Sequence, residues 1–230
     1  IAGNAVGGMV GRVISSQVSH YKSWQFASEF IGIWCLIFAI LFFILAPKSQ
    51  NFKPKKESFK TLIEPNFKLI THPKLLPYYI TGFLLLGTFV SLYNYVFVLY
   101  ISGVFGSMNV SFWERKLKNS ENVLKTMSLV GILGILFFFL QNTIAVIVGL
   151  AVFTYSFFVA HTVCSKSVGN FSKEKRTVTI AFYLLLYYIG ASTLGSFSGV
   201  ILQKLDWQVF LVFLTIIFGI IYLIFVFKKE

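Results

Sequence analysis

Long apolar runs dominate the chain, and short polar segments separate them. Two of these runs, GILGILFFFL at 131–140 and IIFGIIYLIFVF at 216–227, contain no charged residue. A helix needs about 20 apolar residues to cross the hydrocarbon core of a bilayer. The pattern therefore predicts an all-α polytopic membrane protein with about eight transmembrane helices. The predicted spans are 1–18, 27–46, 76–94, 96–112, 126–141, 143–163, 178–201 and 207–227.

The polar segments between these runs differ sharply in charge. The longest, 47–74, begins at Pro47 and holds seven lysines. Together with 113–125, 164–176 and the C-terminal tail it carries 17 of the 20 Lys and Arg residues, whereas the alternate connections carry two. By the positive-inside rule the cation-rich side faces the cytoplasm. We therefore expect the loops 47–74, 113–125 and 164–176 and the C-terminus to be cytoplasmic.

The third and fourth predicted spans are crowded. Residues 75–112 must hold both of them with almost no connection between the two helices. A single long helix would avoid the crowding, but it would move the basic segment 113–125 to the outside and so violate the charge rule. The sequence therefore favours a compressed hairpin.

Composition agrees with a membrane protein and disfavours other classes. The chain is 57% hydrophobic and 12% charged, whereas soluble domains are about 25% charged. Its net charge of +12 lies in short segments, none long enough to form the basic face of a nucleic-acid-binding domain. Cys35 and Cys164 lack metal-ligand spacing, and no enzyme motif is visible. We expect no metal, no cofactor, no nucleic-acid partner and no enzymatic activity.

An internal repeat links the two ends of the chain. The segment GGMVGRVISS…SWQF near the start is similar to LGSFSGVILQKLDWQVF near the end, and Trp24-Gln25 aligns with Trp207-Gln208. Parallel repeats of this kind occur in secondary transporters. Small residues four apart also let membrane helices approach closely. The predicted helix-packing glycines are Gly3, Gly7, Gly11, Gly103, Gly106, Gly195 and Gly199.

Four stretches carry a resemblance to a known family. They are IAGNAVGGMVGRVIS at 1–15, GFLLLGTFVSLYNYVFVLY at 82–100, VFTYSFFVAHTVCSKSVG at 152–169 and FYLLLYYIGASTLGSFSGVI at 182–201. They resemble the fifth, seventh, tenth and eleventh helices of the major facilitator superfamily, in its multidrug/proton-antiporter-like branch of bacterial inner-membrane transporters.

The resemblance implies an organisation. Residues 1–46 would be helices five and six of a twelve-helix protein, so the first four helices would be absent. Residues 47–74 would link the two halves in the cytoplasm, and 75–230 would form the C-terminal six-helix half. The family usually has more residues between Asn94-Tyr95 and Ile101, which implies a shortened eighth helix. Its Gly- and Asp-containing loop motif is replaced here by NVSFWERKLKNSENVL, with Glu114 where Asp is typical.

Polar residues inside the spans are the candidate functional residues. Arg12 would line a substrate path, because a charge within a span usually faces a cavity or a partner; the alternative is that it snorkels to the interface. His161 and Glu29 are candidate proton-relay groups, since histidine titrates near neutrality. A hydrogen bond to the backbone of a neighbouring helix is the alternative role for His161. The other substrate-path candidates are Tyr93, Asn94, Tyr95, Asn109, Tyr187 and Tyr188.

Three functions are compatible with these features. The resemblance implies proton-coupled efflux of a small organic solute by alternating access, with membrane lipid, the solute and protons as partners. A non-transporting fragment of such a transporter is one alternative, because half of the central cavity would lack a wall. Solute uptake is the other.

Overall fold

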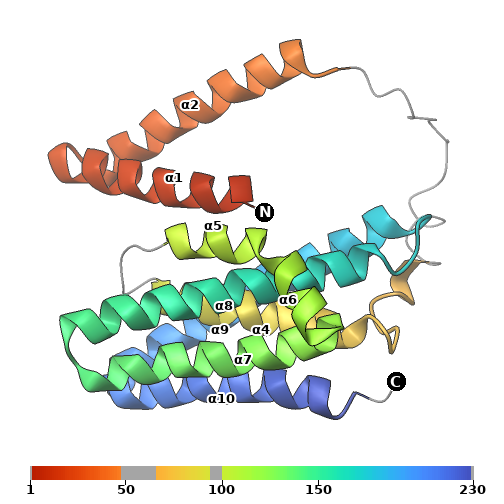
Figure 1. Cartoon of the computed structure of the whole chain (residues 1–230). Coiled ribbons are helices and arrows are strands. Elements are labelled where there is room, and N and C mark those ends of the chain that lie inside the picture. Colours follow the sequence, from red (N-terminus) through yellow and green to blue (C-terminus); the bar gives the residue numbers. More distant parts are fainter. Residues whose placement is uncertain (1, 48–65, 94–99, 229–230) are drawn as a thin grey trace. The chain divides into compact units, whose positions relative to one another are not determined.

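The computed structural model describes residues 2–47, 66–93 and 100–228, and every regular element in these ranges is a helix (Figure 1). The chain divides into a unit of residues 3–62 and a unit of residues 63–230 together with residues 1–2. The all-α polytopic architecture predicted from the apolar runs is confirmed.

The N-terminal unit is a helical hairpin. Helix α1 (Ala2–Tyr21) and helix α2 (Trp24–Leu45) are joined by Lys22 and Ser23. The Ser23 hydroxyl accepts a hydrogen bond from the backbone N–H of Phe26 at 3.2 Å, which satisfies one of the free donors at the start of α2. The helix ends shortly before Pro47, which cannot continue it.

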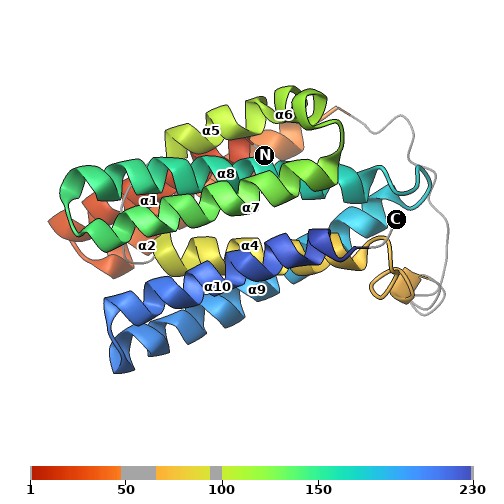
Figure 2. The same cartoon turned by 60° about the horizontal axis from the view of Figure 1, so that its bottom comes forward.

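The C-terminal unit is a bundle of packed helices (Figures 1 and 2). Helix α4 packs mainly against α9, α7 lies between α8 and α10, and α5 packs on α8. The elements are α4 (Leu76–Tyr93), α5 (Tyr100–Met108), α6 (Val110–Leu117), α7 (Ser120–Leu136), the 3-10 helix η1 (Phe137–Leu140), α8 (Thr143–Gly169), α9 (Arg176–Lys204) and α10 (Trp207–Val226).

Short polar residues begin three of these helices. The side chains of Asn119, Asn142 and Asp206 accept hydrogen bonds of 2.7–2.8 Å from backbone N–H groups three residues further on, at the starts of α7, α8 and α10. Trp207 therefore opens α10 directly after a capping residue, as Trp24 opens α2 after Ser23. Both copies of the predicted repeat are a helix, a two-residue turn and a second helix.

Glycines make the closest helix contacts within the bundle. A Cβ on Gly134 of α7 would lie 2.7 Å from the backbone nitrogen of Phe153 in α8, and one on Gly149 of α8 would lie 2.7 Å from the carbonyl oxygen of Gly134. A Cβ on Gly87 of α4 would lie 2.8 Å from the carbonyl oxygen of Gly190 in α9. These distances leave no room for a side chain, so glycine permits the close approach.

Six of the described helices are long and apolar enough to cross a membrane. They are α2, α4, α7 continued by η1, α8, α9 and α10, and they correspond to six of the eight predicted spans. Helix α1 covers the first predicted span but is less apolar. The predicted span 96–112 contains only the nine-residue α5 and the start of α6, and residues 94–99 lie outside the described ranges.

The segment 113–125 is not a loop, so its predicted secondary structure was wrong. Helix α6 runs to Leu117 and α7 begins at Ser120. Lys118 ends α6 in the left-handed conformation, with φ 68°. Charged residues do not prevent helix formation when apolar residues recur on one face, as Val110 and Trp113 do here. Helix α8 likewise continues to Gly169, into the predicted loop 164–176.

Candidate functional site

A line of stacked rings crosses the C-terminal unit between α4, α8 and α9. We call it the aromatic column and define it as Tyr93, Phe89, Phe157, His161 and Tyr187. The ring centroid of Phe89 lies 4.2 Å from the ring centroid of Tyr93 and 4.2 Å from that of Phe157. The centroids of Phe157 and His161 are 6.1 Å apart, and the centroids of His161 and Tyr187 are 4.5 Å apart. All five side chains are buried.

Helical periodicity builds this column. Phe89 and Tyr93 are four residues apart in α4, and Phe157 and His161 are four residues apart in α8. Residues at this spacing lie one above the other on the same helix face. Each helix therefore contributes a pair of stacked rings, and the contact between α4 and α8 brings the two pairs together.

His161 is the basic group of the column. Its Nδ1 atom is hydrogen-bonded to the hydroxyl of Tyr183 in α9 at 2.8 Å. The rings of Phe157, Tyr183 and Tyr187 surround it, and only 6% of its surface is exposed. An ionisable residue inside a membrane span is costly to place there, which makes it a candidate for function.

The far end of the column carries a second polar contact. The hydroxyl of Tyr93, at the end of α4, is hydrogen-bonded to the hydroxyl of Thr154 in α8, and both residues are buried. Thr154 lies seven residues, or about two helical turns, before His161. Tyr93, at one end of the column, is therefore hydrogen-bonded to α8, and His161, near the other end, is bonded to Tyr183, whose ring stacks beside the column.

The structure unites some of the predicted residues and separates others. Tyr93, His161 and Tyr187 belong to the column. Tyr188 is 55% exposed on α9, and Asn109 is exposed at the start of α6. Glu29 is exposed on α2.

Three predicted residues cannot be placed in a site. Asn94 and Tyr95 lie outside the described residues. Arg12 belongs to α1, but its side chain is not among those described. Their roles in a substrate path stay predictions.

The predicted packing glycines also differ in their surroundings. A Cβ on Gly106 of α5 would lie 2.7 Å from the carbonyl oxygen of Tyr155 in α8. One on Gly195 of α9 would lie 3.1 Å from Val90 of α4. Gly103 lies against the ring of Phe158, whereas no described atom approaches the Cβ positions of Gly7 and Gly11. Gly3 lies in α1 and Gly199 in α9.

Sequence reasoning missed three residues of this region: Phe89, Phe157 and Tyr183. Each stands four residues before a residue that was singled out, namely Tyr93, His161 and Tyr187. The recurrence of aromatic pairs at this spacing in three spans was a signal that could have identified them.

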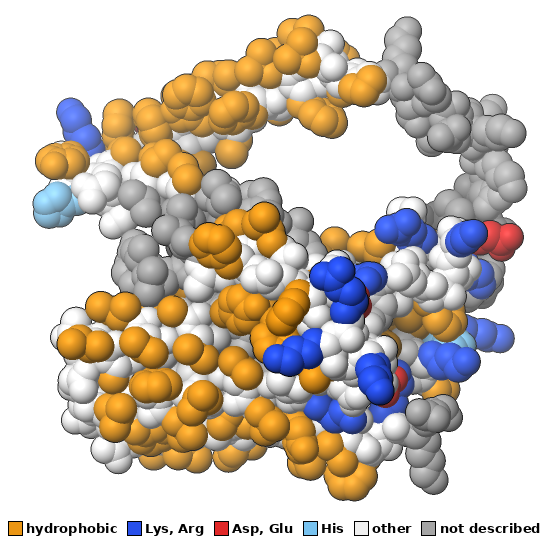
Figure 3. All heavy atoms as spheres, viewed as in Figure 1, with side chains coloured by type: hydrophobic (Ala, Val, Ile, Leu, Met, Phe, Trp, Pro, Cys, Tyr) orange, Lys and Arg blue, Asp and Glu red, His pale blue; other side chains and the backbone are white. Residues whose placement is uncertain are grey.

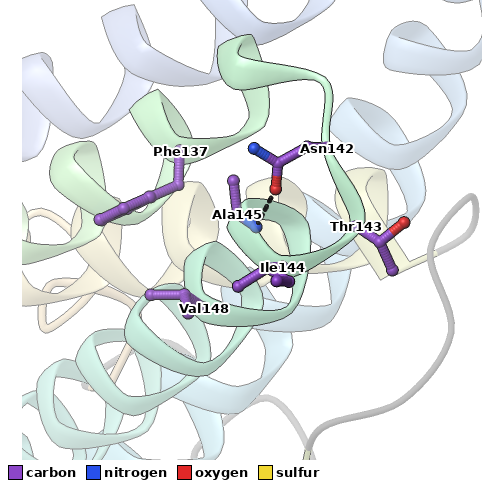
Figure 4. Close-up of a pocket in the computed structure, with 6 residues that line it drawn as sticks. All are labelled: Phe137, Asn142, Thr143, Ile144, Ala145 and Val148. Carbon is purple, nitrogen blue, oxygen red and sulfur yellow. Dashed lines mark hydrogen bonds between the residues drawn. The ribbon is translucent and has the colours of Figure 1, made fainter.

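A separate hollow lies at the start of α8 (Figure 4). It has a volume of about 520 Å³, and its lining residues are Phe137, Asn142, Thr143, Ile144, Ala145 and Val148. The Asn142 side chain bonds the Ala145 backbone N–H, so its oxygen serves as a helix cap. The hollow has a mainly apolar lining and contains no ionisable group, which makes the aromatic column the stronger candidate.

Comparisons with curated proteins find transporters. A protein named an uncharacterized transporter in Buchnera aphidicola subsp. Schizaphis graminum is 29% identical over 226 residues. The uncharacterized MFS-type transporter YybF of Bacillus subtilis is 32% identical over 231 residues. The inner membrane transport protein YnfM of Escherichia coli is 28% identical over 228 residues.

These alignments cover 90% of this chain but only 54%, 56% and 54% of the respective relatives. The chain thus spans about half the length of the curated relatives it matches. No family model and no solved structure matches it.

Proposed function

Because the chain belongs to the major facilitator superfamily, we propose that it takes part in secondary active transport of a small organic solute, coupled to protons and directed outward. Alternating access by rocking of two repeats or bundles is the general mechanism of such carriers. In this proposal residues 1–46 end one half of the transporter, 47–74 link the halves and 75–230 form the other half.

The observation that carries the proposal is the position of His161. It is an ionisable ring buried in a spanning helix, hydrogen-bonded to Tyr183 and stacked on Tyr187. An imidazole can accept and release a proton near neutral pH. A change in the packing of α9 against α8 would alter the Tyr183 contact, and this contact would couple proton binding to helix movement.

The rest of the column supplies apolar and aromatic surface. The rings of Phe89, Tyr93 and Phe157 offer faces for stacking, and the Tyr93 hydroxyl adds a hydrogen-bonding group. Since these rings are packed together in the described state, a solute would reach them only after the helices separate. Such a site suits solutes with an apolar or aromatic part.

Reconstitution of the chain into lipid vesicles tests this proposal. We expect an imposed pH gradient to drive movement of at least one probe across the vesicle membrane. The probes are ethidium, a second fluorescent dye and a labelled sugar. His161→Asn should abolish most of the gradient-driven movement, whereas His20→Asn, which changes an exposed histidine of α1, should not.

The other outcomes contradict different parts of the proposal. Movement that persists after collapse of the pH gradient contradicts proton coupling. Gradient-driven movement in the opposite direction supports uptake. Absence of movement for every probe supports the non-transporting alternative.

A further inference from the structure

Helix α6 (Val110–Leu117) has features that transport does not explain. It follows directly after α5 and is fastened to the bundle on one side. Val110 is buried, and the indole N–H of Trp113 donates a hydrogen bond of 2.8 Å to the hydroxyl of Tyr155 in α8. The orientation of this short helix relative to α8 is therefore defined.

The acidic residue of α6 is neutralised within the protein. Glu114 pairs with Lys166 of α8 at 2.5 Å and accepts a hydrogen bond from Ser120 at 3.1 Å. Only 17% of its side chain is exposed. The helix therefore offers no free negative charge to its surroundings.

The cations of α6 and its C-cap face outward instead. Arg115, Lys116 and Lys118 are all exposed, and Arg115 and Lys118 form no ion pair with any residue that the structure describes. The ammonium group of Lys116 lies 5.8 Å from the ring centre of Phe112 and 5.5 Å from that of Trp113. Three positive charges thus stand beside two aromatic rings.

The apolar neighbours place this helix at a boundary. Phe105 and Met108 of α5 and Phe112 of α6 are 59%, 71% and 49% exposed. In the C-terminal unit, hydrophobic side chains cover the flank and the Lys and Arg side chains gather at one end, with α6 where the two meet (Figure 3). Aromatic rings beside cations at such a boundary are typical of the membrane–water interface.

We propose that α6 binds the headgroup of an anionic phospholipid at the membrane surface. Arg115, Lys116 and Lys118 attract the phosphate, while Phe112 and Trp113 lie at the boundary between headgroups and acyl chains. Each Lys or Arg near an anionic surface strengthens association about fivefold, and an amphipathic helix with aromatic residues lies naturally in this plane. The inference depends on membrane insertion and is independent of the proposed transport activity.

Quenching of Trp113 fluorescence by brominated lipids tests the proposal directly. The full chain, carrying W24F, W34F and W207F so that Trp113 is its only tryptophan, is placed in phosphatidylcholine vesicles. Brominated phosphatidylglycerol or brominated phosphatidylcholine is then added in steps. We expect phosphatidylglycerol to associate with the Trp113 site at least about fivefold more strongly than phosphatidylcholine does.

Two matched variants separate a local site from general charge. R115Q/K118Q removes two exposed cations that make no ion pair in the described structure, and it should lower the lipid preference by about fivefold or more. K173Q/K175Q makes the same charge change in the exposed segment between α8 and α9, and it should leave the preference intact.

Three results would overturn the proposal. The first is equal quenching by the two lipids in the parent protein. The second is an equal loss of preference in both variants, which would indicate diffuse attraction to the whole charged end. The third is loss of preference on addition of millimolar glycerol phosphate, which would show that the cations bind a free phosphate rather than a lipid.

Discussion

Two buried tyrosine hydroxyl groups of the bundle differ in whether they have a hydrogen-bond partner. The hydroxyl of Tyr183 is bonded to His161 of α8. The hydroxyl of Tyr79 in α4 is also buried but has no hydrogen-bond partner among the described residues. Removing a bonded group leaves its partner unsatisfied, whereas removing an unpartnered group costs nothing comparable.

This difference predicts opposite effects for the same chemical change. Tyr183→Phe should lower the free energy of unfolding by about 1 kcal/mol, within the range measured for hydrogen bonds between membrane helices. Tyr79→Phe should leave it unchanged or raise it. Unfolding of the purified protein by sodium dodecyl sulphate in mixed micelles measures both values. Equal destabilisation by the two variants would contradict the assigned hydrogen bond.

At the scale of helices, the bundle depends on where glycine allows backbones to touch. Gly134 of α7 faces the backbone of α8, so an added methyl group would meet the nitrogen of Phe153 and the carbonyl of Gly149. Gly219 of α10 has no atom of the described structure near its Cβ position. The two glycines look alike in sequence, since each interrupts an apolar run.

Alanine at these two glycines should therefore act differently. Gly134→Ala is expected to destabilise the protein by about 1–3 kcal/mol, because α7 and α8 must move apart. Gly219→Ala should be neutral or slightly stabilising, because alanine favours a helix more than glycine does. Thermal unfolding in detergent compares them, and a loss of stability in Gly219→Ala alone would show that the assigned α7–α8 contact is wrong.

Lys228 joins the end of α10 to two other helices. Its ammonium group pairs with Glu121 of α7 at 2.5 Å, donates to the Tyr78 hydroxyl of α4 at 3.3 Å and lies 4.6 Å from the centre of that ring. Burial acts to lower the pKa of Lys228, but the hydrogen bond to Glu121 and the contacts with Tyr78 outweigh it. The pKa is therefore raised above its ordinary value of 10.5.

A raised pKa for a cation defines the pH range in which it stabilises the fold. The ordinary pKa of 10.5 is the value that Lys228 has in the unfolded chain. The contribution of Lys228 to the free energy of unfolding is therefore fully present below pH 10.5, and it is lost as the pH rises through the higher pKa of the folded state. Lys228→Met should lower the free energy of unfolding by up to about 1 kcal/mol at pH 8. The difference in this free energy between the variant and the parent should shrink above pH 10.5. Lys204→Met, at an exposed lysine of α9, is the control. A loss of stability in Lys228→Met that does not change with pH would contradict the charged contact of Lys228 with Glu121.

At the scale of the whole molecule, the distribution of charge predicts how the chain sits in the membrane. The turn around Lys173 and the turn at Gln141 lie at opposite ends of α8, which is 27 residues or about 40 Å long. The first turn belongs to the cation-rich side and the second to the side with few cations. The positive-inside rule therefore puts Lys173 in the cytoplasm and Gln141 outside.

Labelling of single cysteines in cells tests this orientation. In a background without Cys35 and Cys164, Gln141→Cys should react with a membrane-impermeant maleimide in intact cells. Lys173→Cys should react only after the membrane is permeabilised. The reverse pattern would refute the predicted topology.

The amino-acid sequence by itself determined the helical class, most of the spans and the end of the second span before Pro47. The length of the apolar runs and the position of proline suffice for these features, and neither requires knowledge of a partner helix. For the same reason the sequence could single out Tyr93, His161 and Tyr187, each of which is a polar group within an apolar run.

Only the tertiary structure decided which of these residues meet. Lipid supplies no hydrophobic drive between helices, so their packing depends on shape and on individual polar contacts between distant segments. The spacing of residues along α4 and α8 could not show that Tyr93 bonds Thr154, or that His161 bonds the side chain of Tyr183 rather than the backbone of a neighbouring helix. Nor could charge alone show that 113–125 folds into helices, because Trp113 is held in place by Tyr155 of α8, about 40 residues away in sequence.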